Sequence, residues 1–154
     1  MKKLFALVAV VLSVGALAST LSGRSRGMSS NRFVGAWRLV SLQEPGADGN
    51  IQTADCTGLL VYTPDGHMSV QVMYRNPQPS AKANPVQYSQ GGYEASFGRY
   101  EVDDSHTFTF HVEGALVRSL IGKTLKRVYE FSGDQLIVRS PDPNEHWRVT
   151  WQRD

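Results

Sequence analysis

Residues 58–74 read GLLVYTPDGHMSVQVMY, two short runs of strand-forming residues joined by the turn sequence TPDG at residues 63–66. Proline presets the φ angle of a turn and glycine accepts the positive φ that closes it, so the stretch predicts a β-hairpin. In the second run Met68, Val70 and Val72 alternate with polar residues. That period is typical of a strand with one buried face.

Similar short runs, separated by turn residues, follow along most of the chain. We expect eight strands, over residues 34–42, 58–63, 67–74, 97–102, 107–113, 124–131, 135–140 and 146–153. Residues 114–122 are expected to form one or two helical turns or a connecting loop. Eight antiparallel strands joined in order close into a barrel that has no exposed edges. The predicted fold class is all-β, an eight-stranded antiparallel up-and-down barrel; a two-sheet sandwich is the alternative.

The N-terminus has the composition of an export signal. Lys2 and Lys3 precede an uncharged apolar run over residues 4–18, which ends in Ala16-Leu17-Ala18. These parts predict a signal peptide over residues 1–18, cleaved before Ser19, and hence a periplasmic or secreted protein. The alternative is a membrane anchor, but a spanning helix needs about 20 apolar residues and this run is shorter. We therefore expect no stable membrane anchor.

Two further segments lie outside the predicted strands. Residues 19–31 are small, polar and rich in Gly and Ser, so we expect a disordered leader before a domain over residues 32–154. Residues 75–92 hold three prolines and two glycines and predict a long loop. Loops of this length inside a compact domain are often functional.

Composition excludes several classes of function. The chain has 16 Lys plus Arg and 14 Asp plus Glu, and the loss of Lys2 and Lys3 with the signal leaves 14 of each. Without a clustered basic face, we expect no nucleic-acid partner. Cys56 is the only cysteine, so it forms no internal disulfide and is interpreted as an inert thiol. The chain contains no P-loop, dinucleotide fingerprint, zinc pattern or nucleophile motif, so we expect no cofactor, metal site or catalytic residue.

Several blocks of sequence occur in an order that resembles a known family. They are FVGAWRLVS at residues 33–41, followed by residues 60–70, 97–102, 111–113, 133–136 and 149–151. The chain resembles the lipocalin-like domain family over about residues 32–153. The resemblance implies a calycin-type barrel in which Trp37 plugs one end, with Arg148 or Arg153 over its ring. It also implies binding of small apolar molecules inside the barrel, although some lipocalin relatives are enzymes.

Six residues are candidates for contact with a ligand. They are Tyr62, Met68, Tyr100, His111, Glu113 and Arg127. The first three, like Trp147, are either cavity walls or ordinary core residues. Arg127 lies on the same strand face as two aromatic residues, and inside a barrel it would need an anionic partner, either Glu113 or a ligand carboxylate.

His111 and Glu113 are two residues apart on one predicted strand, so their side chains project to the same face. The sequence leaves open whether that face is the cavity or the solvent. Inside the barrel the pair could orient a polar ligand or perform acid–base chemistry; otherwise it is a polar pair that stabilises the fold.

The main functional hypothesis is an exported protein that binds a small, largely apolar molecule without turnover. Two alternatives remain at this stage. One is an isomerase or cyclase that acts on a small hydrophobic substrate through His111 and Glu113. The other is a packed structural module without a ligand.

Overall fold

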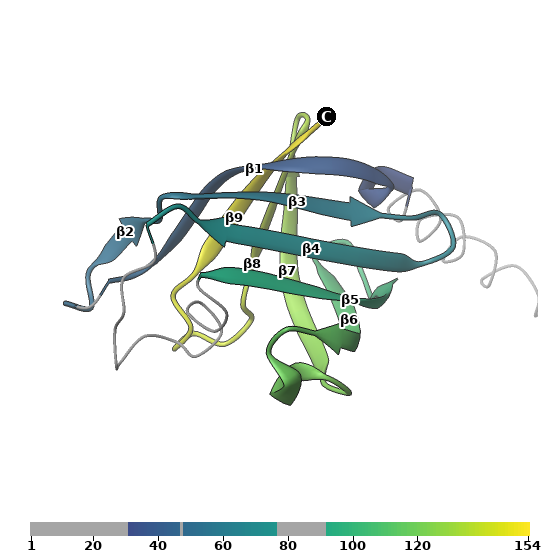
Figure 1. Cartoon of the computed structure of the whole chain (residues 1–154). Coiled ribbons are helices and arrows are strands. Elements are labelled where there is room, and N and C mark those ends of the chain that lie inside the picture. The colour runs from purple at the N-terminus through teal and green to yellow at the C-terminus, as the bar shows by residue number, and fades with distance from the viewer. Residues whose placement is uncertain (1–30, 47, 77–91) are drawn as a thin grey trace, which may run out of the picture.

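The computed structural model describes residues 31–46, 48–76 and 92–154 (Figure 1). The predicted signal peptide, most of the leader and most of the loop at residues 75–92 therefore lie outside the described residues. The elements, in chain order, are β1 (Gly35–Pro45), β2 (Ile51–Thr53), β3 (Cys56–Tyr62), β4 (His67–Tyr74), β5 (Tyr93–Val102), β6 (Thr107–Ala115), the 3₁₀ turn η1 (Arg118–Leu120), β7 (Thr124–Ser132), β8 (Gln135–Arg139) and β9 (Arg148–Arg153). No helix among the described residues is long and apolar enough for a membrane crossing.

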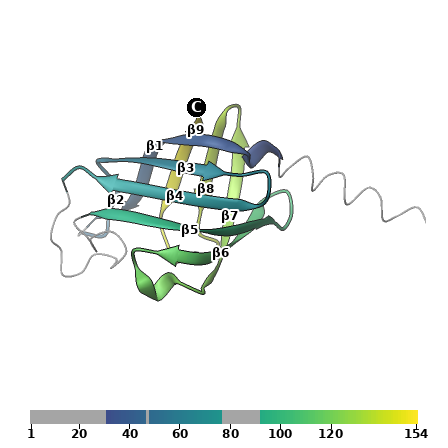
Figure 2. The same ribbon diagram turned by 45° about the vertical axis from the view of Figure 1, so that its right-hand side comes forward.

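The strands form one antiparallel sheet that closes on itself. From β3 to β9 each strand pairs with the next in the chain, and β1 pairs with both β3 and β9. The closing register runs from Trp37 opposite Arg153 to Gln43 opposite Arg148. Figure 2 shows β3, β4 and β5 on the near wall of the barrel, with β8 and β9 behind them. The closed eight-stranded antiparallel barrel confirms the predicted fold class.

Two strands differ most from the prediction, and one helical turn agrees with it. A short strand, β2, pairs with the outer end of β1 in a region expected to be all turns. Its three residues are exposed, so no buried alternation marks it in the sequence. β5 begins at Tyr93, four residues before the predicted start, because pairing with β4 extends to Met73. η1 supplies the single helical turn that residues 114–122 were expected to form as one of two options.

Two β-bulges help the sheet to curve. The register between β1 and β9 shifts between Leu39 and Ser41, and Val40 at the shift is 54 % exposed. The register between β5 and β6 shifts between Phe97 and Gly98. A Cβ atom on Gly98 would lie 2.0 Å from the carbonyl oxygen of His111, so only glycine lets the two backbones approach this closely. Such bulges bend and twist a strand locally, as barrel closure requires.

One end of the barrel is filled by Phe33, which precedes β1 and is fully buried. Five aromatic rings surround it at centroid distances of 4.8 to 5.8 Å, namely Tyr62, Tyr100, Phe108, Tyr129 and Phe131. We call this cluster of six rings the aromatic half. Offset and edge-to-face contacts of this kind stabilise a core beyond the area that they bury.

Trp37 closes the same end. Its ring is buried, its Nε1 donates a hydrogen bond of 2.7 Å to the Phe33 carbonyl oxygen, and the guanidinium carbon of Arg153 lies 4.1 Å from the ring centroid. The predicted arginine–tryptophan contact is therefore confirmed, with Arg153 rather than Arg148. Gly35 has a φ of 134°, and a Cβ there would lie 2.9 Å from Nη1 of Arg153. In the Gly-x-Trp motif, Trp37 therefore supplies the ring on which the arginine stacks. Gly35 leaves space for the arginine and adopts a backbone conformation that favours glycine.

Candidate functional site

The opposite end of the barrel carries polar side chains on its inner wall. β1 and β4 end there, and β5 begins there, because neighbouring strands are antiparallel (Figure 1). The inward-facing polar side chains are Glu44, Tyr74, Glu94, Ser96 and Arg127, which we call the polar half. Their orientation follows from buried cross-strand neighbours: Glu94 is opposite Val72, and Arg127 is opposite Phe108.

Glu44 and Tyr74 form a buried hydrogen-bonded pair. The Tyr74 hydroxyl donates to Oε2 of Glu44 over 3.1 Å, and both residues are at least nine-tenths buried. Burial raises the pKa of the Glu44 carboxyl, while the Tyr74 hydrogen bond acts in the opposite direction. Cys56 is close by, and burial together with the Glu44 charge raises the pKa of its thiol to about 11. A thiol with such a pKa is a poor nucleophile at neutral pH.

Arg127 brings a positive charge to the inner wall. Its guanidinium carbon lies 5.1 Å from the centroid of the Trp147 ring, and its Nη1 donates a 3.0 Å hydrogen bond to the Lys126 carbonyl oxygen. Burial lowers the pKa of the guanidinium, while the charges of Glu145 and Glu94 act in the opposite direction. Arginine nevertheless stays protonated in proteins, so the site keeps a fixed cation.

Glu94 is the carboxylate that faces Arg127 across the interior, but the two do not form a direct ion pair. Among the described residues, no carboxylate oxygen lies within 4.0 Å of the Arg127 nitrogens. Burial raises the pKa of Glu94 to about 7, and the Arg127 charge offsets only part of this effect. At neutral pH the side chain is therefore divided between its neutral and ionised forms.

Tyr62 carries a buried hydroxyl group without a hydrogen-bond partner among the described residues. The side chain is only 2 % exposed. Burial raises the pKa of the phenol, and the Arg127 charge acts in the opposite direction. Almost all buried polar atoms in proteins have a partner, so an orphaned hydroxyl requires a specific explanation.

The predicted ligand contacts fall into three groups. Tyr62, Met68 and Tyr100 are buried and face inward, where Tyr62 and Tyr100 belong to the aromatic half. Arg127 also faces inward, but toward the polar half. The structure thus places four of the six residues on the inner wall of the barrel.

His111 and Glu113 lie on the other face. Along β6 the buried residues are Phe108, Phe110 and Val112, while His111 is half-buried and Glu113 is exposed. The His111 ring contacts the Thr124 hydroxyl, with 3.3 Å between Nδ1 and Oγ1. The pair therefore does not line the interior and does not face Arg127, so the arrangement required by the isomerase or cyclase hypothesis is not formed.

Sequence reasoning missed four residues of the polar half, namely Glu44, Tyr74, Glu94 and Ser96. Glu44 follows the predicted end of the first strand, and Glu94 precedes the predicted start of the fourth. The signal that could have found Glu94 is its spacing from Ser96 and Tyr100, which places all three on one face of a longer strand. Among the described residues, no group of three or more His, Cys, Asp or Glu side chains is arranged to hold a metal ion.

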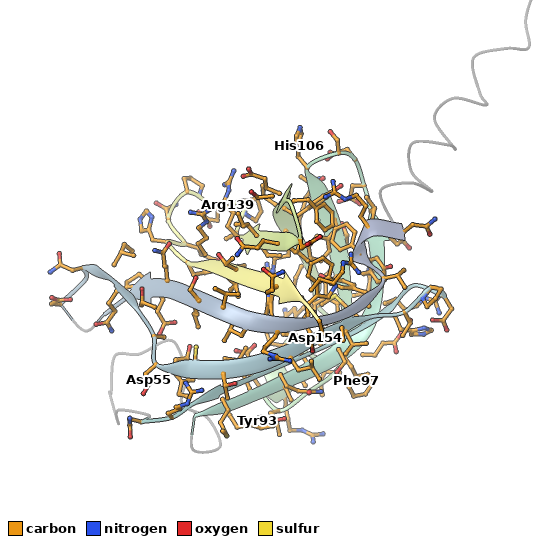
Figure 3. The ribbon with its side chains drawn as sticks, turned by 90° about the horizontal axis from the view of Figure 1, so that it is seen from above. Asp55, Tyr93, Phe97, His106, Arg139 and Asp154 are labelled. Carbon is orange, nitrogen blue, oxygen red and sulfur yellow. The ribbon has the colours of Figure 1, made fainter. Side chains whose placement is uncertain are left out.

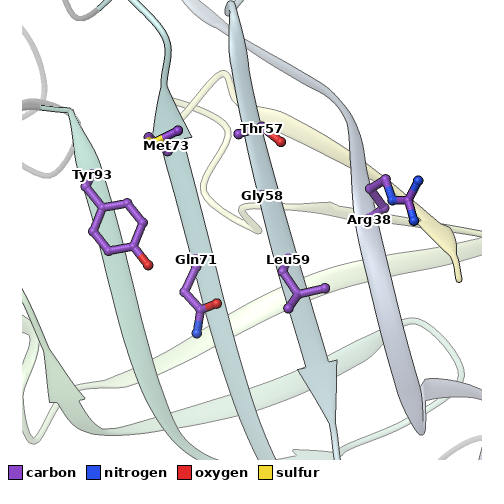
Figure 4. Close-up of a pocket in the computed structure, with 7 residues that line it drawn as sticks. All are labelled: Arg38, Thr57, Gly58, Leu59, Gln71, Met73 and Tyr93. Atoms are coloured by element: carbon purple, nitrogen blue, oxygen red, sulfur yellow. The ribbon is translucent and has the colours of Figure 1, made fainter.

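The outer wall carries two shallow hollows, of about 340 and 290 Å³. The larger lies across β1, β3, β4 and β5, with Leu59, Met73 and Tyr93 around Gly58 (Figure 4). The smaller includes Phe97 and Leu116. Tyr93 and Phe97 project from the outer face of β5 (Figure 3). These apolar side chains belong to the exterior and are separate from the inner wall.

A closed up-and-down barrel with an arginine-capped tryptophan at one end and a polar inner wall at the other defines a calycin-type β-barrel domain. The lipocalin-like domain family matches residues 34–153, and the chain belongs to that family. A comparison with curated proteins gives no match.

Three solved structures are similar to this chain at low sequence identity. A redesigned β-barrel is 15 % identical, with a TM-score of 0.48 and coverage of 82 % of this chain and 95 % of that one. An uncharacterised protein from Bacteroides eggerthii is 14 % identical, with a TM-score of 0.47 and coverage of 79 % and 99 %. A mutant of the fluorescent protein UnaG is 14 % identical, with a TM-score of 0.41 and coverage of 80 % and 97 %.

Proposed function

We propose that this protein binds a small, largely apolar molecule in the barrel, with the ligand entering through the polar half. One observation carries the proposal: Glu94 and Arg127 face the same interior but do not pair directly. A half-buried charge without a close counter-ion is costly in a module that serves only as a packed core. In a binding site the same charges orient a ligand whose apolar part contacts the surrounding side chains.

The aromatic half supports this assignment of the two ends. Phe33 and its five neighbouring rings occupy the interior near Trp37, so a ligand would lie toward the opposite end. Lipocalin-like barrels use their interior for small molecules, and membership of this family favours the same use here. The proposal also includes export after cleavage before Ser19, which the N-terminal apolar run indicates.

The test is direct binding by the purified protein. We expect organic extraction or native mass spectrometry to find a bound small molecule, and the neutral fluorescent probe N-phenyl-1-naphthylamine to bind in its place. Ser96→Leu would place extra volume on the inner wall, so it should weaken probe binding at least tenfold. Ser69→Leu is the matched control, because Ser69 follows the buried Met68 on β4 and its side chain therefore faces the outer wall.

The two variants separate a barrel site from an exterior one. Equal losses in both variants, or a loss only in Ser69→Leu, would contradict binding in the interior. A folded protein that binds neither the probe nor any extracted molecule would be the packed module without a ligand.

A further inference from the structure

We propose that the outer wall of the barrel binds a tetrahedral oxyanion, a phosphate or sulfate group, through Arg99 with His67 and His111 on either side. We call these three residues the outer row. They come from β5, β4 and β6 and are direct neighbours in the sheet, since His67 is opposite Arg99 and Arg99 is opposite His111. Figure 2 shows the three strands side by side. The outer row is separate from the interior, so the inference does not depend on the proposed function.

All three side chains of the outer row lie on the solvent side of the sheet. Arg99 is exposed on β5, and His111 is half-buried between the buried residues Phe110 and Val112 of β6. The His67 side chain is 42 % exposed. Directly opposite residues have Cβ atoms about 4.5–5.5 Å apart. Both imidazoles therefore lie within reach of an anion held by the central guanidinium.

The contact between His67 and Arg99 fixes the position of the proton on the imidazole. Nε2 of His67 lies 3.3 Å from Nη1 of Arg99. A guanidinium has no acceptor, so Nε2 accepts the hydrogen bond and carries no proton. The ring proton is therefore on Nδ1, which donates to Oδ2 of Asp65 over 3.1 Å. On the side of β3 the neighbour is Thr63, which is uncharged. His67 is thus neutral in this arrangement.

A second proton on His67 turns this contact into an anion site. Nε2 then also donates, so two cationic donors meet without an acceptor between them. An oxyanion between them accepts from both, and such charge-assisted hydrogen bonds are the stronger ones. Asp65 stabilises the imidazolium from the other ring nitrogen, and it stays ionised because a hydrogen bond from the Thr63 side chain lowers its pKa. Anion binding and proton uptake by His67 therefore favour each other.

The surrounding charges leave Arg99 available to an anion. Among the described residues, no carboxylate oxygen lies within 4.0 Å of the Arg99 nitrogens. The acidic residues of the same outer face, Glu101 and Glu113, are each two positions along their strand from the outer row. Nδ1 of His111 faces the Thr124 hydroxyl, and its Nε2 has no hydrogen-bond partner in the described part of the chain. The outer row therefore offers an unpaired cation and an unused ring nitrogen.

The outer row suits an oxyanion better than a metal ion. The guanidinium between the two imidazoles repels a cation, and the described residues contain no group of three His, Cys, Asp or Glu side chains arranged to hold one. A tetrahedral oxyanion presents acceptors in several directions, which matches donors that come from three strands. Such a group belongs either to a soluble molecule or to a lipid head group.

The test is an NMR titration of the histidine ring signals of the purified protein with sodium sulfate, at constant ionic strength. Sulfate keeps the same charge at pH values of about 5.5 and about 8, between which histidine changes its own charge. We expect the His67 and His111 signals to shift saturably, with binding at least threefold tighter at the lower pH. The signals of His106 and His146, which lie outside the strands, should not shift.

Two variants and a matched control locate the anion. Arg99→Met removes the central charge and should weaken sulfate binding at least tenfold. His67→Gln cannot take up a proton, so it should reduce the difference in affinity between the two pH values. Arg38→Met is the control, because Arg38 is an exposed arginine on the outer wall of β1, and it should leave binding unchanged.

Equal shifts of all four histidine signals, or equal losses in Arg99→Met and Arg38→Met, would show an adventitious ion only and overturn the site. Sulfate affinity that is the same at both pH values would overturn the role of His67. Sedimentation with phosphatidylglycerol vesicles identifies the source of the oxyanion. Sedimentation that Arg99→Met abolishes would support a lipid head group, and sulfate binding without sedimentation would support a soluble oxyanion.

Discussion

The guanidinium of Arg153, in the last strand, lies over the Trp37 ring of the first strand, with 4.1 Å between the guanidinium carbon and the ring centroid. The same arginine donates from Nη1 to the Val34 carbonyl oxygen over 2.8 Å, and it also donates to the carbonyl of Arg32. The residues that begin and end the barrel are thereby joined by stacking and by hydrogen bonds, in addition to the β1–β9 ladder.

Trp37→Ala should strongly destabilise the fold. The change removes a buried ring, leaves a cavity at the closed end and deprives Arg153 of its stacking partner. Large aromatic-to-alanine changes in cores cost about 3–5 kcal/mol. Urea denaturation of the purified variant measures the loss. Val40→Ala, at an exposed position on the same strand, should change stability by less than about 0.5 kcal/mol. Equal midpoints for Trp37→Ala and wild type would contradict this role.

Phe33→Ala should have an effect of similar size, about 3–5 kcal/mol, because the ring is surrounded by five other rings. The control is Phe97→Ala, since Phe97 is 55 % exposed on the outer wall. Thermal unfolding followed by near-UV circular dichroism compares the two. If the two variants have the same thermal unfolding midpoint, Phe33 does not fill the barrel as described.

Gly35→Ala tests the first residue of the Gly-x-Trp motif. Alanine would meet a positive φ of 134° and the Arg153 guanidinium at 2.9 Å. Gly49→Ala is the control, because Gly49 also has a positive φ, of 81°, but a Cβ atom there would have open space around it. Backbone strain alone costs about 1–2 kcal/mol, so we expect Gly35→Ala to lose clearly more stability than Gly49→Ala in urea. A smaller loss at Gly35 would show that Arg153 moves away without cost.

Tyr62→Phe should not destabilise the protein, because the hydroxyl that it removes is buried without a partner in the described part of the chain. Relieving an unsatisfied polar group adds up to about 1–3 kcal/mol. Tyr129→Phe is the contrasting variant: its hydroxyl donates to the Asp104 carbonyl oxygen over 2.9 Å, so we expect a loss of about 1 kcal/mol. Denaturant midpoints distinguish the two, and a loss in Tyr62→Phe would indicate a structural partner for the hydroxyl.

The free energy of unfolding should fall as the pH rises through the range in which the Glu94 carboxyl loses its proton. Burial raises the pKa of Glu94 from an ordinary value of 4.5 to about 7 in the folded protein. Between these values the folded state binds more protons than the unfolded state, so the contribution is complete below the unfolded pKa and is lost as the pH rises through 7. The Glu44 carboxyl, whose pKa burial also raises, acts in the same direction.

Glu94→Gln replaces the titrating carboxyl group with a neutral amide and so removes the source of this pH dependence. Urea midpoints at pH values of about 4.5 and 8 should differ less in Glu94→Gln than in wild type. Glu113→Gln, on the outer face of β6, should retain the wild-type difference. A Glu94→Gln variant with an unchanged pH dependence would show that this carboxyl is not buried as described.

The fold could be predicted from the sequence because its signals are local. The turn at residues 63–66 and the alternation of Met68, Val70 and Val72 specify a hairpin without reference to the rest of the chain. The three exposed residues of β2 have no such period, and their pairing depends on the extended end of β1.

The candidate site could be predicted only in part. Arg127 shares a strand face with Tyr129, and that spacing was sufficient to suggest an inward position. The orientation of His111 and Glu113 depends on which face of β6 the neighbouring strands bury, and β6 alone cannot decide it. The polar pair of Glu44 and Tyr74 joins residues thirty positions apart, a contact that depends on β1 and β4 lying on either side of β3.

The side chain that fills the aromatic half lies one residue before the match to the lipocalin-like domain family. The family match begins at residue 34, and Phe33 precedes it. The Phe33 carbonyl oxygen also accepts the hydrogen bond from Trp37. A fragment cut at the edge of the family match would therefore keep every strand but lack the ring at the centre of the aromatic half, so the folding unit of this domain starts earlier than its homology boundary.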